Sequence, residues 1–156
     1  MDKNEHLNCL MAEIGPIVDA ESVISFGNDR WAVHMETGRV DVRHLDSQSK
    51  FVLESSLGKP WLDNTAFLSE LVLTYNYLYE EHGGARIAQI SPEIGWVLLF
   101  DVFTRGITSN ELGEAIMRFY LVSLQWSALI QVEPMDDKAC LEAKKAIDFG
   151  MSAIRP

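Results

Sequence analysis

Apolar residues near the start of the chain recur at steps of three and four, which is typical of an amphipathic helix. The stripe consists of Leu7, Leu10, Met11 and Ile14, followed by Ile17 and Val18. Gly15-Pro16 is expected to weaken or end this helix, because proline lacks the backbone N–H that a helix needs. The segment 26–30, with Gly27 and Asn28, then offers the chemistry of a turn.

From Trp31 onward the apolar period changes to two, which predicts half-buried strands. A two-residue loop at Thr37-Gly38 would place Val33 opposite Val42, Trp31 opposite His44 and His34 opposite Asp41. After a loop at 46–49, residues 50–54 form a third short strand with Phe51 and Leu53 on one side. The pattern therefore predicts an antiparallel meander.

The second predicted helix follows the break at Gly58-Lys59-Pro60, with Asp63 or Asn64 as its cap. Its apolar positions are Phe67, Leu68, Leu71, Val72, Tyr75, Leu78 and Tyr79. This apolar sector is wide for a surface helix, so two of its faces are expected to be buried. Gly83-Gly84 is expected to end it.

Residues 86–90 and 96–103 predict a second hairpin, whose later strand is almost continuously apolar and therefore central or interfacial. Thr108 and Glu111 form a capping box that begins a long core helix ending before Pro134. The tail beyond Pro134 is expected to add a short terminal helix.

These elements predict an α+β fold: a strongly twisted antiparallel sheet of about five strands with three main helices, in the order α-β-β-β-α-β-β-α. Residues 1–133 form the predicted domain, and residues 134–156 form a C-terminal extension. A chain of 156 residues is long enough to bury one core.

Composition narrows the functional classes. The formal charge of −10 would repel a phosphate backbone, so a nucleic-acid partner is disfavoured. The apolar runs are too short or too interrupted for membrane insertion, and the first six residues lack a basic region followed by an apolar run, so we expect no secretory signal. Cys9 and Cys140 lie outside any metal or disulfide spacing, which fits a reducing cytoplasm.

No residue pattern indicates catalysis. His6, His34, His44 and His82 are scattered, and a single histidine–aspartate pair across two strands is far more often a surface contact than half of a catalytic dyad. The serines and glycines match no nucleophile or phosphate-binding motif. We therefore expect a binding protein without an enzymatic activity, a metal or a cofactor.

Three local sequences resemble their counterparts in class I type III secretion chaperones of the Tir-chaperone (CesT-like) family. They are Ile24-Ser25-Phe26-Gly27-Asn28-Asp29-Arg30, Leu78-Tyr79-Glu80-Glu81-His82-Gly83-Gly84, and Trp96-Val97-Leu98-Leu99-Phe100 before a capped final helix. Together with the element order and the acidic charge, the resemblance covers about residues 5 to 132. The segment after Pro134 lies outside it.

The resemblance implies a homodimer in the bacterial cytoplasm that binds the N-terminal segment of one or a few secreted effectors. It implies that the chain keeps this segment unfolded and soluble and delivers it for secretion. The secretion ATPase is a further candidate partner. The main alternative is a non-secretory α+β adaptor or regulatory module, and a weaker one is a small hydrolase or ligand-binding domain.

By position, the resemblance assigns two sets of contact residues. The dimer interface is assigned to Leu68, Leu71, Val72, Tyr75, Tyr79, Ile87, Ile90, Trp96, Leu98 and Phe100. Effector binding is assigned to Leu7, Leu10, Met11, Ile14, Val33, Phe51 and Leu53. For the first helix, a plain core stripe is an equally weighted alternative to a binding groove.

Overall fold

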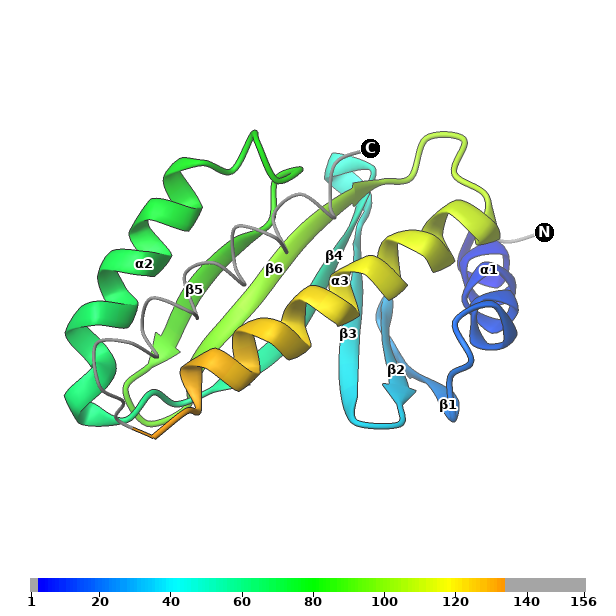
Figure 1. The fold of residues 1–156 in the computed structure, drawn as a ribbon. Helices are drawn as coiled ribbons and strands as arrows, with labels where there is room; N and C mark the ends of the chain where they lie inside the picture. Colours follow the sequence, from blue (N-terminus) through cyan, green and yellow to red (C-terminus); the bar gives the residue numbers. More distant parts are fainter. Residues whose placement is uncertain (1–2, 134–156) are drawn as a thin grey trace. The chain divides into compact units, whose positions relative to one another are not determined.

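The computed structural model describes residues 3–133 (Figure 1). Its helices and strands are α1 (Lys3–Ile17), β1 (Ser22–Gly27), β2 (Arg30–Met35), β3 (Gly38–Leu45), β4 (Lys50–Gly58), α2 (Thr65–Tyr77), β5 (Arg86–Ser91), β6 (Gly95–Phe103) and α3 (Ser109–Ile130). The terminal helix expected after Pro134 lies outside the described residues.

The strands form one sheet in the order β1-β2-β3-β4-β6-β5, and the α+β fold is confirmed. The sheet has six strands, one more than expected, because the apolar pattern does not predict β1. The sequence of β1 alternates weakly, and only Val23 among its residues is even half-buried. An exposed end strand leaves little trace in the apolar pattern, which explains the omission.

The first hairpin has a different register from the predicted one. Its loop is Glu36-Thr37, and Val33 lies opposite Val40 instead of Val42. His34 is therefore opposite Arg39, so the expected pairing with Asp41 is wrong, and Trp31 is opposite Val42 instead of His44. The shift is two residues, and an even shift leaves every side chain on its predicted face.

Contacts within the chain divide it into two compact units. Unit 1 contains α1, β1 to β3, most of β4, the end of β6 and the first half of α3. Unit 2 contains the end of β4, α2, β5, the start of β6 and the second half of α3. The expectation that residues 1–133 form one domain stays a prediction.

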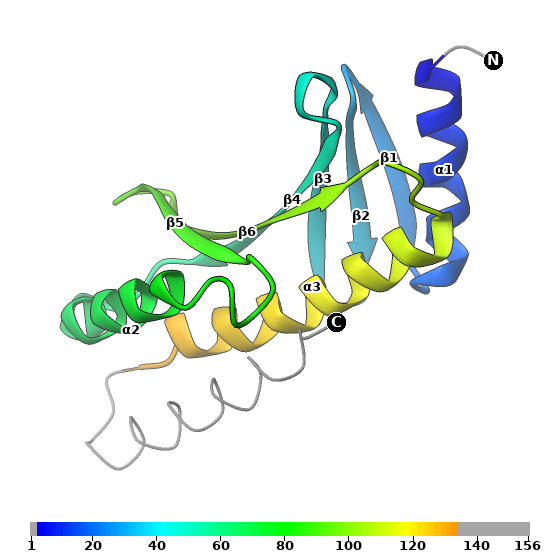
Figure 2. The same cartoon turned by 90° about the horizontal axis from the view of Figure 1, so that it is seen from above.

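The core of unit 1 is formed by α1, the inner face of β2 to β4 and the first half of α3. Met11 and Ile14 of α1 are fully buried, as are Val33 and Phe51 on the strands. Trp31 packs edge-on against Phe51 and donates its indole N–H to Asn8 of α1. Figures 1 and 2 both show α1 beside β1.

The helix α1 does not end at Gly15-Pro16. Pro16 lies in its last turn, and the N–H of Val18 still donates to the carbonyl of Ile14 at 3.0 Å. Proline at this position removes one hydrogen bond near the end of the helix, where the loss affects little of the hydrogen-bond ladder.

In unit 2, α2 lies beside β5 (Figure 2). The Asn76 side chain connects them, because it donates to the Ile87 carbonyl at 2.8 Å and accepts from the Ile87 N–H at 2.9 Å. The helix α2 ends at Tyr77, so the expectations that it includes Leu78 and Tyr79 and that Gly83-Gly84 ends it are wrong. Leu78 is its C-cap, and Tyr79 lies in the following turn. Helix α3 of Ser109–Ile130 begins and ends where the sequence predicts.

Candidate functional site

One face of the sheet in unit 1 is not covered by α1. Residues at alternate positions of a strand share a face, so the register places Arg30, Ala32 and His34 of β2 on this face. Their direct neighbours on β3 are Arg43, Asp41 and Arg39, and those on β4 next to Arg43 and Asp41 are Val52 and Glu54. We call this surface the outer face.

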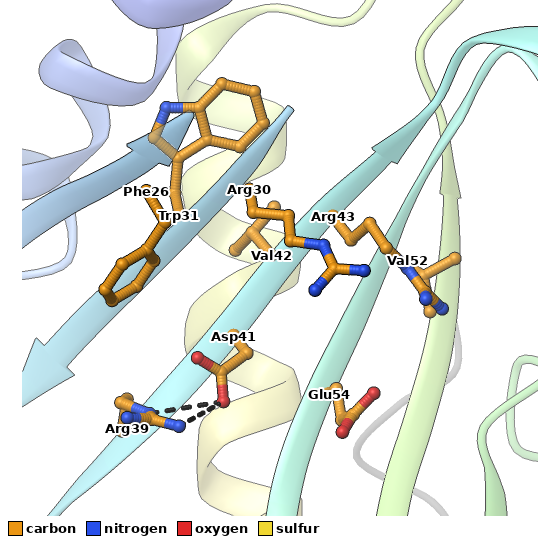
Figure 3. A pocket seen from close by; sticks show the side chains of 9 residues that line it. All are labelled: Phe26, Arg30, Trp31, Arg39, Asp41, Val42, Arg43, Val52 and Glu54. Atoms are coloured by element: carbon orange, nitrogen blue, oxygen red, sulfur yellow. Dashed lines mark hydrogen bonds and ion pairs between the residues drawn. The ribbon is translucent and has the colours of Figure 1, made fainter. Parts of the chain in front are cut away.

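The outer face is hollowed into a pocket of about 460 Å³ (Figure 3). Its lining residues are Phe26, Arg30, Trp31, Arg39, Asp41, Val42, Arg43, Val52 and Glu54. They come from the four strands β1 to β4. The pocket combines three guanidinium groups and two carboxylates with apolar side chains.

Within the pocket the charges are unevenly paired. Arg39 donates two hydrogen bonds to Asp41, at 2.8 and 3.2 Å. Arg30 and Arg43 lie directly opposite each other on β2 and β3, and both are exposed. Asp41 likewise faces Glu54 on β4. Like charges in direct cross-strand positions repel each other, so the charged side chains of the pocket do not neutralise one another in pairs.

The strand β1 borders this surface with exposed apolar side chains. Ile24 is 43% exposed and Phe26 is 61% exposed. β1 is a terminal strand of the sheet and pairs only with β2 among the described strands. Such an edge offers backbone N–H and C=O groups to another extended segment.

The residues assigned to effector binding lie mostly in the core of unit 1. Leu7, Met11, Ile14, Val33, Phe51 and Leu53 are buried, and Leu10 is intermediate. These six buried side chains are not accessible to a partner in this conformation. Their assignment as effector contacts stays a prediction, while the exposed apolar groups nearby are Ile24 and Phe26.

A second set of exposed apolar side chains lies on unit 2. Leu73 and Tyr77 are one turn apart on α2, with exposed fractions of 69% and 84%, and Ile90 on the terminal strand β5 is half-exposed. We call these three residues the α2–β5 surface.

The residues assigned to the dimer interface are distributed differently. Leu68, Val72, Tyr75, Ile87, Trp96 and Leu98 are buried within the chain, Leu71 and Phe100 are intermediate, and Tyr79 and Ile90 are half-exposed. The buried members belong to the packing of the chain itself, so of the ten assigned residues those at the surface are the ones that a second copy could reach. The assignment itself stays a prediction.

The described residues contain no group of three or more histidine, cysteine, aspartate or glutamate side chains placed to hold a metal. His44 and His82 are buried and belong to different units. Burial raises the pKa of the Tyr75 hydroxyl above its ordinary value.

Within residues 3–133, no helix combines the length and the apolar character needed to span a bilayer.

The sequence does not predict a role for Arg30 and Arg43 in a pocket. Its pattern places Arg30 in a turn, and the predicted register keeps Arg43 away from it. The actual loop at Glu36-Thr37 makes the two arginines neighbours, so the signal is present only in the hairpin register. Arg86 and Arg105, which are isolated arginines in the sequence, do not line this pocket.

Neither a protein-family model nor a curated protein matches the sequence. Solved structures do match the fold. A chain of the HopA1–SchA chaperone–effector complex has a TM-score of 0.65 at 8% identity, covering 81% of this chain and 98% of that one. A chain of the ExsC–ExsE complex has a TM-score of 0.65 at 17% identity, covering 83% and 97%.

A chain from the Yersinia pestis type III secretion chaperone SycH in complex with a fragment of YscM2 has a TM-score of 0.58 at 15% identity. That match covers 76% of this chain and 97% of the other. Because each match covers three quarters or more of both chains, the likeness concerns the architecture and not one motif. This protein has the fold of the type III secretion chaperones.

Proposed function

We propose that this protein is a type III secretion chaperone. It binds the N-terminal chaperone-binding segment of one or a few effectors, keeps that segment unfolded and soluble, and delivers it for secretion. It acts in the bacterial cytoplasm as a homodimer, without catalysis. The secretion ATPase is a candidate partner during delivery.

The observation that carries this proposal is the combination of the fold with an exposed recognition surface. The HopA1–SchA and SycH–YscM2 chains share the architecture of this chain over most of their length. The outer face adds a pocket of about 460 Å³ beside a terminal strand with exposed Ile24 and Phe26. An extended segment can insert side chains into such a pocket and pair its backbone with the strand.

The α2–β5 surface supports the homodimer. Leu73 and Tyr77 project from one face of α2, and Ile90 lies on the strand beside that helix. Large apolar side chains that stay exposed on adjacent elements are typical of protein contacts. A second copy would cover both elements through a self-complementary two-fold contact.

The narrower assignment to the Tir-chaperone (CesT-like) class rests on the local sequence resemblance. The described structure gives two of those segments defined roles. Asn28 and Asp29 adopt positive φ angles in the tight β1–β2 turn, and Gly83 and Gly84 do so in the segment that leads to β5. These backbone conformations favour asparagine, aspartate and glycine, which accounts for the residue types at those positions.

The proposal is tested by recovering the client and by asking whether its secretion needs this chain. The affinity-tagged protein is purified from its native bacterium, and co-purifying proteins are identified and truncated. We expect a protein held through its N-terminal region, and we expect deletion of the chaperone gene to reduce export of that protein. Recovery of a partner that is not exported would instead favour the adaptor function.

A matched pair of variants locates the binding surface. Phe26→Asp places a charge at the outer face, and Ile94→Asp places one in the β5–β6 turn; both residues are 61% exposed. We expect client recovery to fall with Phe26→Asp and to persist with Ile94→Asp, with both proteins remaining folded. Equal recovery by the two variants would remove β1 and the outer face from the proposal.

A further inference from the structure

Arg30 and Arg43 form a cationic pair without a counter-ion among the described residues. They are direct neighbours across β2 and β3, both are exposed, and neither makes an ion pair with another described residue. Figure 3 shows the two side chains extending from neighbouring strands at the pocket. Like charges in this position destabilise the hairpin, so an anion bound between them would be favoured.

The nearby carboxylates do not neutralise this pair. Asp41 is held by Arg39 through two hydrogen bonds. Glu54 lies opposite Asp41 and diagonal to Arg43, and among the described residues it makes no ion pair with Arg43. The pocket therefore has three arginines and two carboxylates in its lining, a net charge of +1 in a chain whose formal charge is −10.

Apolar groups lie on either side of the arginine pair. Val52 is the direct neighbour of Arg43 on β4 and is almost fully buried, and Phe26 lines the pocket from the end of β1. A ligand that reaches the guanidinium groups would therefore also meet apolar surface. A free inorganic anion uses only the first of these features, whereas a peptide with an acidic and an apolar side chain uses both.

We propose that Arg30 and Arg43 bind the carboxylate of an aspartate or glutamate side chain within an otherwise apolar, extended segment of the client. This inference rests on the proposed function and specifies the chemistry of the segment that the outer face selects. One carboxylate matches the single excess positive charge. A phosphate dianion would exceed it and would also face Glu54 and the acidic remainder of the chain.

The test uses a library of random linear peptides selected on the wild-type protein and on the Arg30→Gln/Arg43→Gln variant. Arg105→Gln, which removes an exposed arginine outside the pocket, is the matched control. Wild type and control should enrich an acidic residue flanked by apolar ones, and the double variant should lose the acidic preference. Enrichment of the same apolar sequences by all three proteins would overturn the inference.

Selected peptides are then measured by fluorescence anisotropy against their asparagine or glutamine versions. We expect the amide versions to bind wild type about five- to tenfold more weakly, and the difference to vanish with the double variant. Added salt should reduce the affinity of the acidic peptides. Competition by inorganic phosphate as strong as that by the peptide would identify a simple anion site and contradict the peptide assignment.

A purely structural role for the arginines would give a different result. If Arg30 and Arg43 stabilised the hairpin, the double variant would lower Tm, whereas relief of their repulsion should leave Tm unchanged or raise it. Failure of the inference is distinguishable from failure of the proposed function. Equal recovery of a client by wild type and the double variant would contradict only the inference. Selection of acidic peptides without any exported client would contradict only the proposed function.

Discussion

The most deeply buried polar side chain among the described residues of unit 2 is His82, which follows α2. It is fully buried, and its ring stacks on Tyr75 with centroids 3.8 Å apart and planes 6° from parallel. Its Nε2 atom lies 2.6 Å from the carbonyl oxygen of Tyr75. Tyr75 in turn packs edge-on against Trp126 of α3. His82 therefore joins the turn after α2 to the aromatic core of this unit.

We predict that His82→Ala destabilises the protein by about 2–3 kcal/mol, because it removes a buried ring and a hydrogen bond to the backbone. Urea unfolding followed by tryptophan fluorescence measures this change. The neighbouring exposed residue gives the control, Glu81→Ala, which should change the free energy of unfolding by less than about 0.5 kcal/mol. Equal effects of the two substitutions would contradict the role assigned to His82.

The capping box at the start of α3 is the contact most directly specified by local sequence. The Glu111 carboxylate accepts the Thr108 N–H at 2.8 Å, and the Glu111 N–H donates to the Thr108 hydroxyl at 3.3 Å. The hydrogen bond from the Thr108 backbone, followed by that from its hydroxyl, lowers the pKa of Glu111 below its ordinary value of 4.5. The ionised form is therefore the one that caps the helix.

A lowered pKa in the folded state predicts the pH dependence of this cap. The stabilisation by Glu111 is present above the unfolded pKa, near 4.5, and is lost as the pH falls through the lower folded value. Wild type should exceed Glu111→Gln in Tm at neutral pH, and this difference should shrink with acidification below pH 4.5. A difference that stays constant or grows on acidification would exclude this cause.

At the scale of elements, the β5–β6 hairpin is constrained by the end of β4. Gly95 has φ of +106°, and a Cβ atom there would collide with the backbone carbonyl of Gly58. The register also shifts between Gln89 and Ser91, beside this turn. The close approach of two backbones thus requires glycine at position 95 for both its conformation and its lack of a side chain.

We predict that Gly95→Ala costs at least about 2 kcal/mol, since strain at positive φ is combined with displacement of the β4 backbone. Gly84→Ala is a matched control, because Gly84 has a similar φ of +94° and a Cβ atom there would meet nothing within 4 Å. It should cost only the backbone strain, about 1 kcal/mol. Chemical denaturation that ranks Gly84→Ala as the more harmful would refute the contact argument.

At the scale of the whole molecule, the proposed homodimer gives the exposed groups of α2 a role as contacts between two copies. Leu73 is 69% exposed and Tyr77 is 84% exposed, whereas Leu68 on the same helix is buried. Charges at surface and core positions therefore have different effects. An aspartate at Leu73 disturbs only a surface, and an aspartate at Leu68 enters the core without a partner.

We predict that Leu73→Asp and Tyr77→Asp convert the proposed homodimer into folded monomers, because an unpaired charge would be buried at the proposed contact. Leu68→Asp should instead lose helical circular dichroism. Size-exclusion chromatography with light scattering gives the mass, and Leu121→Asp, at a 52% exposed position on α3, is the control. Dimers that survive both surface charges would remove the α2–β5 surface from the interface.

Local sequence determined much of the fold. The capping box of α3, the alternating strands and the apolar stripe of α1 each depend on neighbours within a few residues, so all three could be predicted from the sequence. The sequence pattern did not predict the strand β1, because this strand is exposed and buries almost no side chain. Faces were predicted correctly even where the β2–β3 register was not, since an even shift preserves them.

Tertiary structure alone decided which residues form the candidate site. The pocket depends on Arg30 and Arg43 meeting across two strands, a contact that a shift of two residues would abolish without disturbing the apolar pattern. Burial also depends on tertiary structure. The apolar stripes of α1 and α2 could be recognised in the sequence, but only packing buries Met11 and Leu68 and leaves Phe26 and Leu73 exposed. Periodicity identifies a face, whereas register and packing determine what that face meets.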